Sequence, residues 1–148
     1  MSTVKIFPLQ FVKDSSIITV NNFQQYYTTK NQGARKLGIS LEKDDRVLIV
    51  KLDGDVDHHA VEKYKARIDD EYEKNNCKHI VFDFGQVSFL DSSGIGMIIG
   101  RYKNAAQKNG KTAVSGMGEY ISRIYIMSGL SKIIEHYDSL SEAVEYIK

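Results

Sequence analysis

The chain has 148 residues, of which 42% are apolar and 26% charged, a composition typical of one globular domain. Its single cysteine, Cys77, excludes an intrachain disulfide and favours a reducing compartment, and nothing near it in the sequence indicates a nucleophile. The net charge of +1 divides into +4 over residues 1–38 and −3 over the remainder, so the body lacks the clustered Lys and Arg of a nucleic-acid-binding protein.

Residues 1–38 differ from the rest in being rich in Asn, Gln, Tyr and Thr, and two segments, 4–11 and 17–20, have the composition of strands. We expect an extension that is partly disordered, strand-forming or a leader foreign to the domain that follows. No apolar run approaches the roughly 20 residues of a membrane span. The first residues also lack the pattern of a signal peptide, so we expect a cytoplasmic protein with no membrane partner.

From residue 39 onward, strands and helices are predicted to alternate. A strand at 38–42 should pair with a strand at 46–52 across a turn at Asp44-Asp45. The next helix carries apolar side chains three or four positions apart: Val61, Tyr64, Ile68 and Tyr72. A buried strand at 80–84 then leads through a short turn into Asp91-Ser92-Ser93-Gly94, where a second helix begins at once.

The second helix has an apolar stripe formed by Ile95, Ile98, Ile99, Tyr102 and Ala106. Asn109-Gly110 is expected to end this helix, with the glycine in the left-handed conformation.

The last part of the chain is predicted to contain two short strands and two helices. The strands are expected at 112–115 and 132–134, and a helix at 119–128 should stop at Gly129. The final helix, capped by Ser139 or Ser141, buries a stripe of four side chains: Leu140, Ala143, Val144 and Ile147. Strands separated by helices predict right-handed crossovers, so the fold class is α/β, a single domain with a mixed, mostly parallel sheet and about four helices.

Two hydroxyl groups, those of Ser92 and Ser93, lie where the second helix begins. A helix start offers free backbone N–H groups and the positive end of the helix dipole, and both favour a phosphate. That phosphate could belong to a bound ligand or be carried by the serine itself.

The same region allows three other interpretations. The glycines at 94, 96 and 100 depart from the dinucleotide-binding spacing and lack the acidic residue that would bind ribose, so close helix–sheet packing is the better interpretation. A metal site at Asp55, Asp57, His58 and His59 lacks further ligands, and Asp57 is better explained as a helix N-cap. Nucleophilic catalysis by Ser92 would need a base, for which His58 is the candidate, but the Gly-x-Ser-x-Gly motif is absent.

Three segments, taken in order, carry a family resemblance. They are Asp53-Gly54-Asp55-Val56-Asp57-His58-His59; then Phe89-Leu90-Asp91-Ser92-Ser93-Gly94-Ile95-Gly96 with Gly100-Arg101-Tyr102-Lys103; and Met127-Ser128-Gly129-Leu130 with Lys132-Ile133-Ile134. Together they closely resemble the anti-sigma factor antagonists of the STAS domain family, and most of all the sporulation type that antagonises the anti-sigma-F factor. The resemblance covers about residues 39–148, which are therefore expected to form a STAS domain.

The resemblance implies a regulatory protein rather than an enzyme, with no cofactor and no metal. The implied partner is an anti-sigma factor that is also an ATP-dependent serine kinase, from which the unphosphorylated antagonist releases the sigma factor. Phosphorylation of the serine directly after the Asp, here Ser92, abolishes the tight complex, and a metal-dependent serine phosphatase reverses it. The expected partner-binding residues surround this serine: Asp57, His58, His59, Asp91, Ser93, Gly94 and Arg101.

A phosphate at this helix start should gain about 0.3–2 kcal/mol from the dipole and the free N–H groups, so it should not unfold the domain. Its charge would instead repel the nearby carboxylates Asp55, Asp57 and Asp91 and any acidic or apolar partner surface. Two alternatives remain open: a small nucleotide-binding module that uses the same helix start, and a STAS subunit of a larger stress-signalling assembly.

Overall fold

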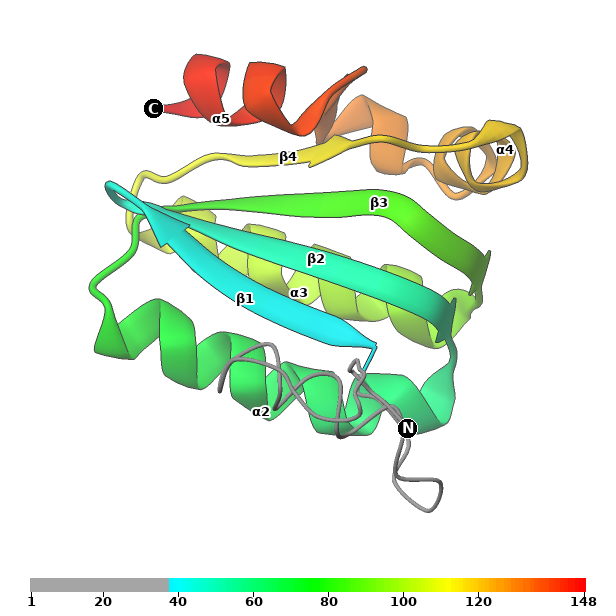
Figure 1. Cartoon of the computed structure of the whole chain (residues 1–148), viewed down its shortest axis with the longest axis horizontal. Coiled ribbons are helices and arrows are strands. Elements are labelled where there is room, and N and C mark those ends of the chain that lie inside the picture. The colour runs from blue at the N-terminus through cyan, green and yellow to red at the C-terminus, as the bar shows by residue number, and fades with distance from the viewer. Residues whose placement is uncertain (1–37) are drawn as a thin grey trace, which may run out of the picture. The chain divides into compact units, whose positions relative to one another are not determined.

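The computed structural model describes residues 38–148, and the extension predicted before them, with its strand-like segments at 4–11 and 17–20, lies outside the described residues. The described chain contains five strands and four α-helices (Figure 1). In order these elements are β1 (Ile39–Asp44), β2 (Val47–Val56), α2 (His58–Lys74), β3 (His79–Leu90), α3 (Ser92–Gln107), β4 (Thr112–Ser115), α4 (Glu119–Met127), a 3-10 turn η1 (Leu130–Lys132), β5 (Glu135–Tyr137) and α5 (Leu140–Ile147).

The five strands form one sheet in the order β1-β2-β3-β4-β5. β1 is antiparallel to β2, and every other neighbouring pair is parallel, which confirms the predicted mixed, mostly parallel sheet. In the β1–β2 hairpin, Asp44 pairs with Val47. Asp45, in the turn between them, adopts a positive φ of 57°.

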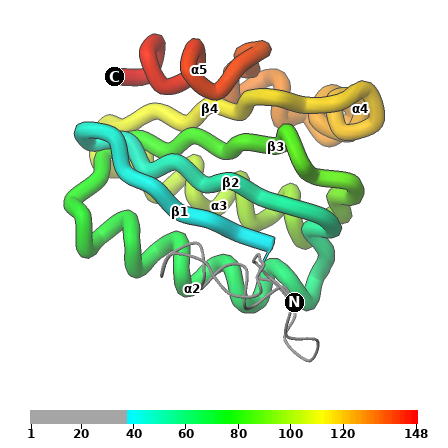
Figure 2. Tube along the Cα trace, in the orientation of Figure 1, coloured from blue at the N-terminus to red at the C-terminus, as the bar shows by residue number. Residues whose placement is uncertain are grey.

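Helices cover both faces of the sheet. α2 and α3 lie along one face and α5 lies along the other, with α4 at one end of the molecule (Figures 1 and 2). The larger core cluster joins β-strand residues to the four predicted buried positions of α2, which are Val61, Tyr64, Ile68 and Tyr72. The smaller cluster packs Ala143, Val144 and Ile147 of α5 on the opposite face, as the stripe of the last helix predicted.

Two predicted features of the central segment are wrong. β3 continues to Leu90 instead of turning after Phe84, because the parallel pairing with β2 continues through two register shifts, each of which places one extra residue on β3. The buried face of α3 is formed by Gly94, Met97, Ile98 and Ala105, whereas Ala106 of the predicted stripe is exposed. The helix is therefore rotated relative to the predicted stripe.

α3 ends at Asn109-Gly110 as predicted, but the residue in the left-handed conformation is not the glycine. The left-handed residue is Asn109, with φ of 60°. The Gly110 amide donates to the Ala105 carbonyl at 2.7 Å and the Asn109 amide to the Ala106 carbonyl at 2.9 Å, the pattern of a Schellman motif. Glycine is required at 110 because a Cβ there would lie 1.7 Å from the Lys78 carbonyl oxygen.

The last strand also lies elsewhere than predicted. Residues 130–132 form the 3-10 turn after Gly129, whose φ of 86° ends α4 as expected, and β5 begins only at Glu135. The Tyr125 hydroxyl donates to the Ile134 carbonyl and so holds this segment against α4. Ser139 caps α5 by accepting from the Glu142 amide at 3.2 Å.

Candidate functional site

Two helices begin side by side at one edge of the sheet. The last residues of β2 and β3, Val56 and Leu90, are partners in the parallel register, and each is followed at once by an aspartate and a helix. Asp57 caps α2, with its Oδ1 accepting from the Ala60 amide at 3.0 Å. The predicted N-cap role of Asp57 is therefore confirmed, and Asp91 occupies the equivalent position at α3.

Ser92 and Ser93, the first two residues of α3, have different surroundings. Ser92 is exposed, and within residues 38–148 its hydroxyl forms no hydrogen bond. Ser93 is half-buried, and its Oγ lies 3.4 Å from Nδ1 of His58 at the start of α2. Of the two hydroxyl groups, that of Ser92 is therefore the more accessible to solvent.

Gly94 allows the close approach of α3 to the sheet. A Cβ at this position would lie 2.5 Å from Cδ1 of Leu90 and 3.1 Å from both Cγ1 and the carbonyl oxygen of Val56. Gly96 and Gly100 would meet nothing within 4 Å. The packing interpretation thus holds for Gly94 and not for the other two glycines.

The start of α3 is not the open anion site that was expected. Asp91 Oδ1 accepts from the amides of Ser93 at 2.9 Å and of Gly94 at 3.1 Å. An aspartate at the N-cap satisfies the same N–H groups that a bound phosphate would use. The expectation of free N–H groups is therefore wrong at these two positions.

The strand ends and helix starts next to Ser92 in the chain carry carboxylates, two histidines and one exposed phenylalanine. Asp55 accepts a hydrogen bond from the Ser88 hydroxyl at 2.9 Å, which ties the ends of β2 and β3 together. His58 and His59 are both exposed, with ring centroids 6.1 Å apart. Phe89, which sequence reasoning missed, is 39% exposed two residues before the Asp91 cap. Its signal in the sequence was a large aromatic residue directly before the Leu-Asp-Ser-Ser-Gly turn.

Arg101 is not brought to this cluster. It lies nine residues after Ser92, about 13 Å along the helix axis. Its guanidinium makes a two-point ion pair with Asp69 of α2, with Nε–Oδ1 at 3.0 Å and Nη2–Oδ2 at 2.7 Å. The side chain is only 12% exposed, and the ion pair ties α3 to α2.

The alternative chemistries gain no support from the geometry. Within residues 38–148, no three His, Cys, Asp or Glu side chains are grouped so that they could hold a metal ion. Cys77 is fully buried, and burial raises the pKa of its thiol, which disfavours the reactive thiolate.

Comparison with known proteins identifies the family. The family model described as the STAS domain matches residues 38–143. The chain belongs to the STAS domain family. A relative from Paenibacillus polymyxa, named anti-sigma F factor antagonist, is 41% identical over 103 residues, which are 70% of this chain and 88% of the relative.

Two solved structures show the same fold. The STAS domain is similar to the anti-sigma factor antagonist SpoIIAA in its unphosphorylated form, with a TM-score of 0.61 and 26% identity over 74% of this chain and 96% of that one. It is equally similar to SpoIIAA of Bacillus in the phosphorylated form, with a TM-score of 0.61 and 28% identity over 74% and 99% of the two chains. The names of these relatives describe antagonists of anti-sigma factors, which are regulatory binding proteins. The chain is therefore classed with regulatory binding proteins and not with enzymes.

None of the helices within residues 38–148 combines the length and the apolar character needed to cross a membrane.

Proposed function

We propose that this STAS protein is an anti-sigma factor antagonist of the sporulation type, switched by phosphorylation of Ser92. The unphosphorylated protein binds a cytoplasmic anti-sigma factor that is also a serine kinase, and the sigma factor is released. Phosphorylation breaks this complex, and a serine phosphatase restores it. The observation that carries the proposal is the exposed Ser92 hydroxyl, free of hydrogen bonds within the described chain, at the first position of α3.

The geometry favours Ser92 over Ser93 as the modified residue. Ser93 is half-buried, its amide donates to Asp91 and its hydroxyl contacts His58. A kinase must reach a serine hydroxyl in line with the γ-phosphate of ATP, and this requires an accessible side chain. Ser92 meets that condition without any change in the fold.

The proposed partner surface is formed at the starts of α2 and α3. It comprises Asp57, His58, His59, Asp91, Ser93 and Gly94 around Ser92, and Phe89 adds an apolar side chain at its side. Aromatic side chains are enriched among the interface residues that supply much of the binding free energy. Arg101 is left out of this surface because its guanidinium is engaged by Asp69.

Phosphorylation of Ser92 would prevent the anti-sigma factor from binding at this surface through charge repulsion. A phosphoserine carries a charge of about −1.5 to −2, and here it would adjoin the carboxylate of Asp91, with Asp55 and Asp57 across the neighbouring strand end. Like charges brought together at an interface cost several kcal/mol. The equal TM-scores to the unphosphorylated and phosphorylated forms of SpoIIAA support a switch without a large change of fold.

The experiment that tests the proposal uses the cognate kinase. The full chain is incubated with the anti-sigma factor and ATP, the phosphorylated peptide is identified by mass spectrometry, and the affinity of both forms for the anti-sigma factor is measured. We expect one phosphate on Ser92, none on the Ser92→Ala variant and normal phosphorylation of the control variant Ser131→Ala, which removes an exposed serine outside the proposed surface. Phosphate on another residue, or equal affinity of both forms, would contradict the switch.

A nucleotide-binding module is disfavoured because Asp91 occupies two of the amides that a nucleotide phosphate would need. Measuring ATP and GTP binding to the isolated protein separates the two functions. A pull-down that returns a multiprotein assembly without a serine kinase would instead favour a STAS subunit of a stress-signalling complex.

A further inference from the structure

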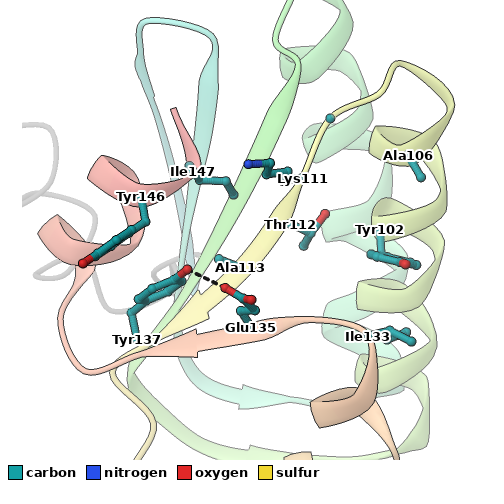
Figure 3. Close-up of a pocket in the computed structure, with 11 residues that line it drawn as sticks. Tyr102, Ala106, Lys111, Thr112, Ala113, Ile133, Glu135, Tyr137, Tyr146 and Ile147 are labelled. Carbon is teal, nitrogen blue, oxygen red and sulfur yellow. Dashed lines mark hydrogen bonds between the residues drawn. The ribbon is translucent and has the colours of Figure 1, made fainter.

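A pocket of about 350 Å³ lies at the β5 edge of the sheet, near the end of α3 (Figure 3). It exists because β5 is short: the pairing between β4 and β5 begins at Ala113, so Lys111 and Thr112 have no strand partner on that side. Ala106, which lines the pocket, is about 20 Å along the helix from Ser92. The pocket is therefore separate from the proposed partner surface.

The walls of the pocket are aromatic on both faces of the sheet. Tyr102 and Ala106 of α3 line one side, and Tyr146 and Ile147 of α5 line the other (Figure 3). The rings of Tyr146 and Tyr137 are stacked, with centroids 5.3 Å apart and an interplanar angle of 14°. Walls of this kind favour a flat, apolar ligand body, and the volume is at the lower end of the range for ligand sites.

A buried hydroxyl group on the floor of the pocket lacks a partner. Thr112 is 7% exposed, and within the described chain its Oγ1 has no hydrogen bond. Buried polar atoms are nearly always hydrogen-bonded, so an unpartnered one calls for a ligand or a water molecule. The Thr112 side chain lies on the α3 side of the pocket and that of Lys111 on the α5 side, so the two offer polar groups from either face of the β4 edge (Figure 3).

Two side chains of opposite charge, Lys111 and Glu135, line the pocket. Lys111 is exposed and has no ion pair within residues 38–148. Glu135 is the strand partner of Ala113, two residues further along β4, which is about 7 Å. The Tyr137 hydroxyl donates to Oε1 of Glu135 at 2.6 Å, and this hydrogen bond, with burial, raises the pKa of Tyr137 to about 12. Tyr137 therefore stays a donor and holds the carboxylate in place.

We propose that this pocket is a binding site for a small aromatic monocarboxylate. The ligand's carboxylate lies against the Lys111 ammonium and the Thr112 hydroxyl, and its ring lies between the tyrosine side chains. A hydroxyl group on the far side of the ring donates to Glu135. A second negative charge on the ligand is excluded because it would meet the Glu135 carboxylate.

The test is an NMR titration of the full chain with 4-hydroxybenzoate, followed by amide chemical shifts. We expect saturable shifts confined to residues 102–113 and 133–147. The uncharged 4-hydroxybenzamide, which has nearly the same shape, should bind about tenfold more weakly, as should the Lys111→Gln variant, because each loses a charge-assisted hydrogen bond. Lys103→Gln, which removes an exposed charge of α3 outside the pocket, should bind as the parent does.

Two further variants change the pocket itself. Ala106→Leu fills the pocket from an exposed helix position and should abolish the shifts while the spectrum remains that of a folded protein. Thr112→Val should weaken binding without lowering the thermal midpoint, because the hydroxyl that it removes has no partner. Shifts that are absent or lie elsewhere, or equal binding of the amide, would overturn the proposal, and so would a lower midpoint of Thr112→Val.

Discussion

The Ser93 hydroxyl oxygen lies 3.4 Å from Nδ1 of His58, and this contact joins the first turns of α3 and α2. Each helix is already capped by its own aspartate, Asp91 or Asp57. The contact therefore arranges the surface between the helices and is not needed to form either of them.

Replacing His58 by alanine should separate binding from folding. Because the side chain is exposed and both caps remain, we expect the free energy of unfolding to change by no more than about 0.5 kcal/mol. Affinity for the anti-sigma factor should fall, since the imidazole lies at the proposed partner surface. Urea denaturation and a binding titration measure the two effects, and unchanged affinity would remove His58 from that surface.

Asp91 should be replaceable by asparagine but not by alanine. Asn caps helices about as well as Asp, whereas loss of the cap in Asp91→Ala should cost about 1 kcal/mol of unfolding free energy, with a range of 0.5–2. Chemical denaturation of both variants provides the measurement. If Asp91→Asn were as destabilised as Asp91→Ala, charge rather than capping would be the contribution of this residue.

Replacing the glycines of α3 by alanine should lower the stability at Gly94 and raise it at Gly96 and Gly100. Gly94→Ala places a methyl group against Leu90 and the backbone of Val56, and such overpacking typically costs about 1–3 kcal/mol. Gly96→Ala and Gly100→Ala meet open space and should stabilise the helix by up to about 1 kcal/mol. Thermal unfolding of the three variants tests this, and equal midpoints would contradict the close approach at Gly94.

Arg101 should contribute to stability and not to partner binding. Replacing it by Met keeps the aliphatic bulk and removes the ion pair with Asp69, and we expect a loss of about 1–3 kcal/mol because charged hydrogen bonds are lost. The partly exposed Asp69 places the effect in the lower part of that range. A double-mutant cycle with Asp69→Asn isolates the pair, and a changed affinity for the anti-sigma factor would restore Arg101 to the interface.

His79 should make the domain less stable at acid pH. Burial lowers the pKa of His79 below its ordinary value of 6.5, helped by the neighbouring charges of Lys78 and Lys111, and its Nδ1 accepts from the Lys111 amide at 3.0 Å. As the pH falls below about 6.5, the unfolded chain binds the proton before the folded one does, so stability decreases. His79→Gln retains an acceptor without titrating, and its unfolding free energy should depend less on pH below about 6.5. An identical pH dependence in both proteins would assign the effect to other groups.

The periodic parts of the sequence predicted the structure best. The stripe of α2 and the buried face of α5 were found because a helix that covers a sheet buries side chains every three or four residues. α3 was rotated in the prediction because Ile95, Ile99 and Tyr102 are apolar but only partly buried, while Ala105 and Gly94 are small and buried. A pattern based on hydrophobicity does not reveal positions such as Gly94 and Ala105, which are buried because their side chains are small.

Features that depend on contacts distant in sequence were missed. Ile133 and Ile134 have strand-like composition, yet the hydrogen bond from Tyr125 to the Ile134 carbonyl delays β5 until Glu135. The ion pair of Arg101 could not be predicted because its partner, Asp69, is 32 residues away in the sequence. The two aspartate caps, by contrast, need only local residues, and Asp57 was predicted correctly.

The engagement of the Ser93 and Gly94 amides by Asp91 has a consequence for reversibility. A phosphoryl group on Ser92 would find those donors already taken and would remain hydrated at the surface. It would then gain little from the domain that carries it, and its hydrolysis would not have to overcome a stabilising contact. The phosphoryl group would therefore be readily accessible to a phosphatase. The lifetime of the phosphorylated, inactive form would then be set by the activity of that enzyme.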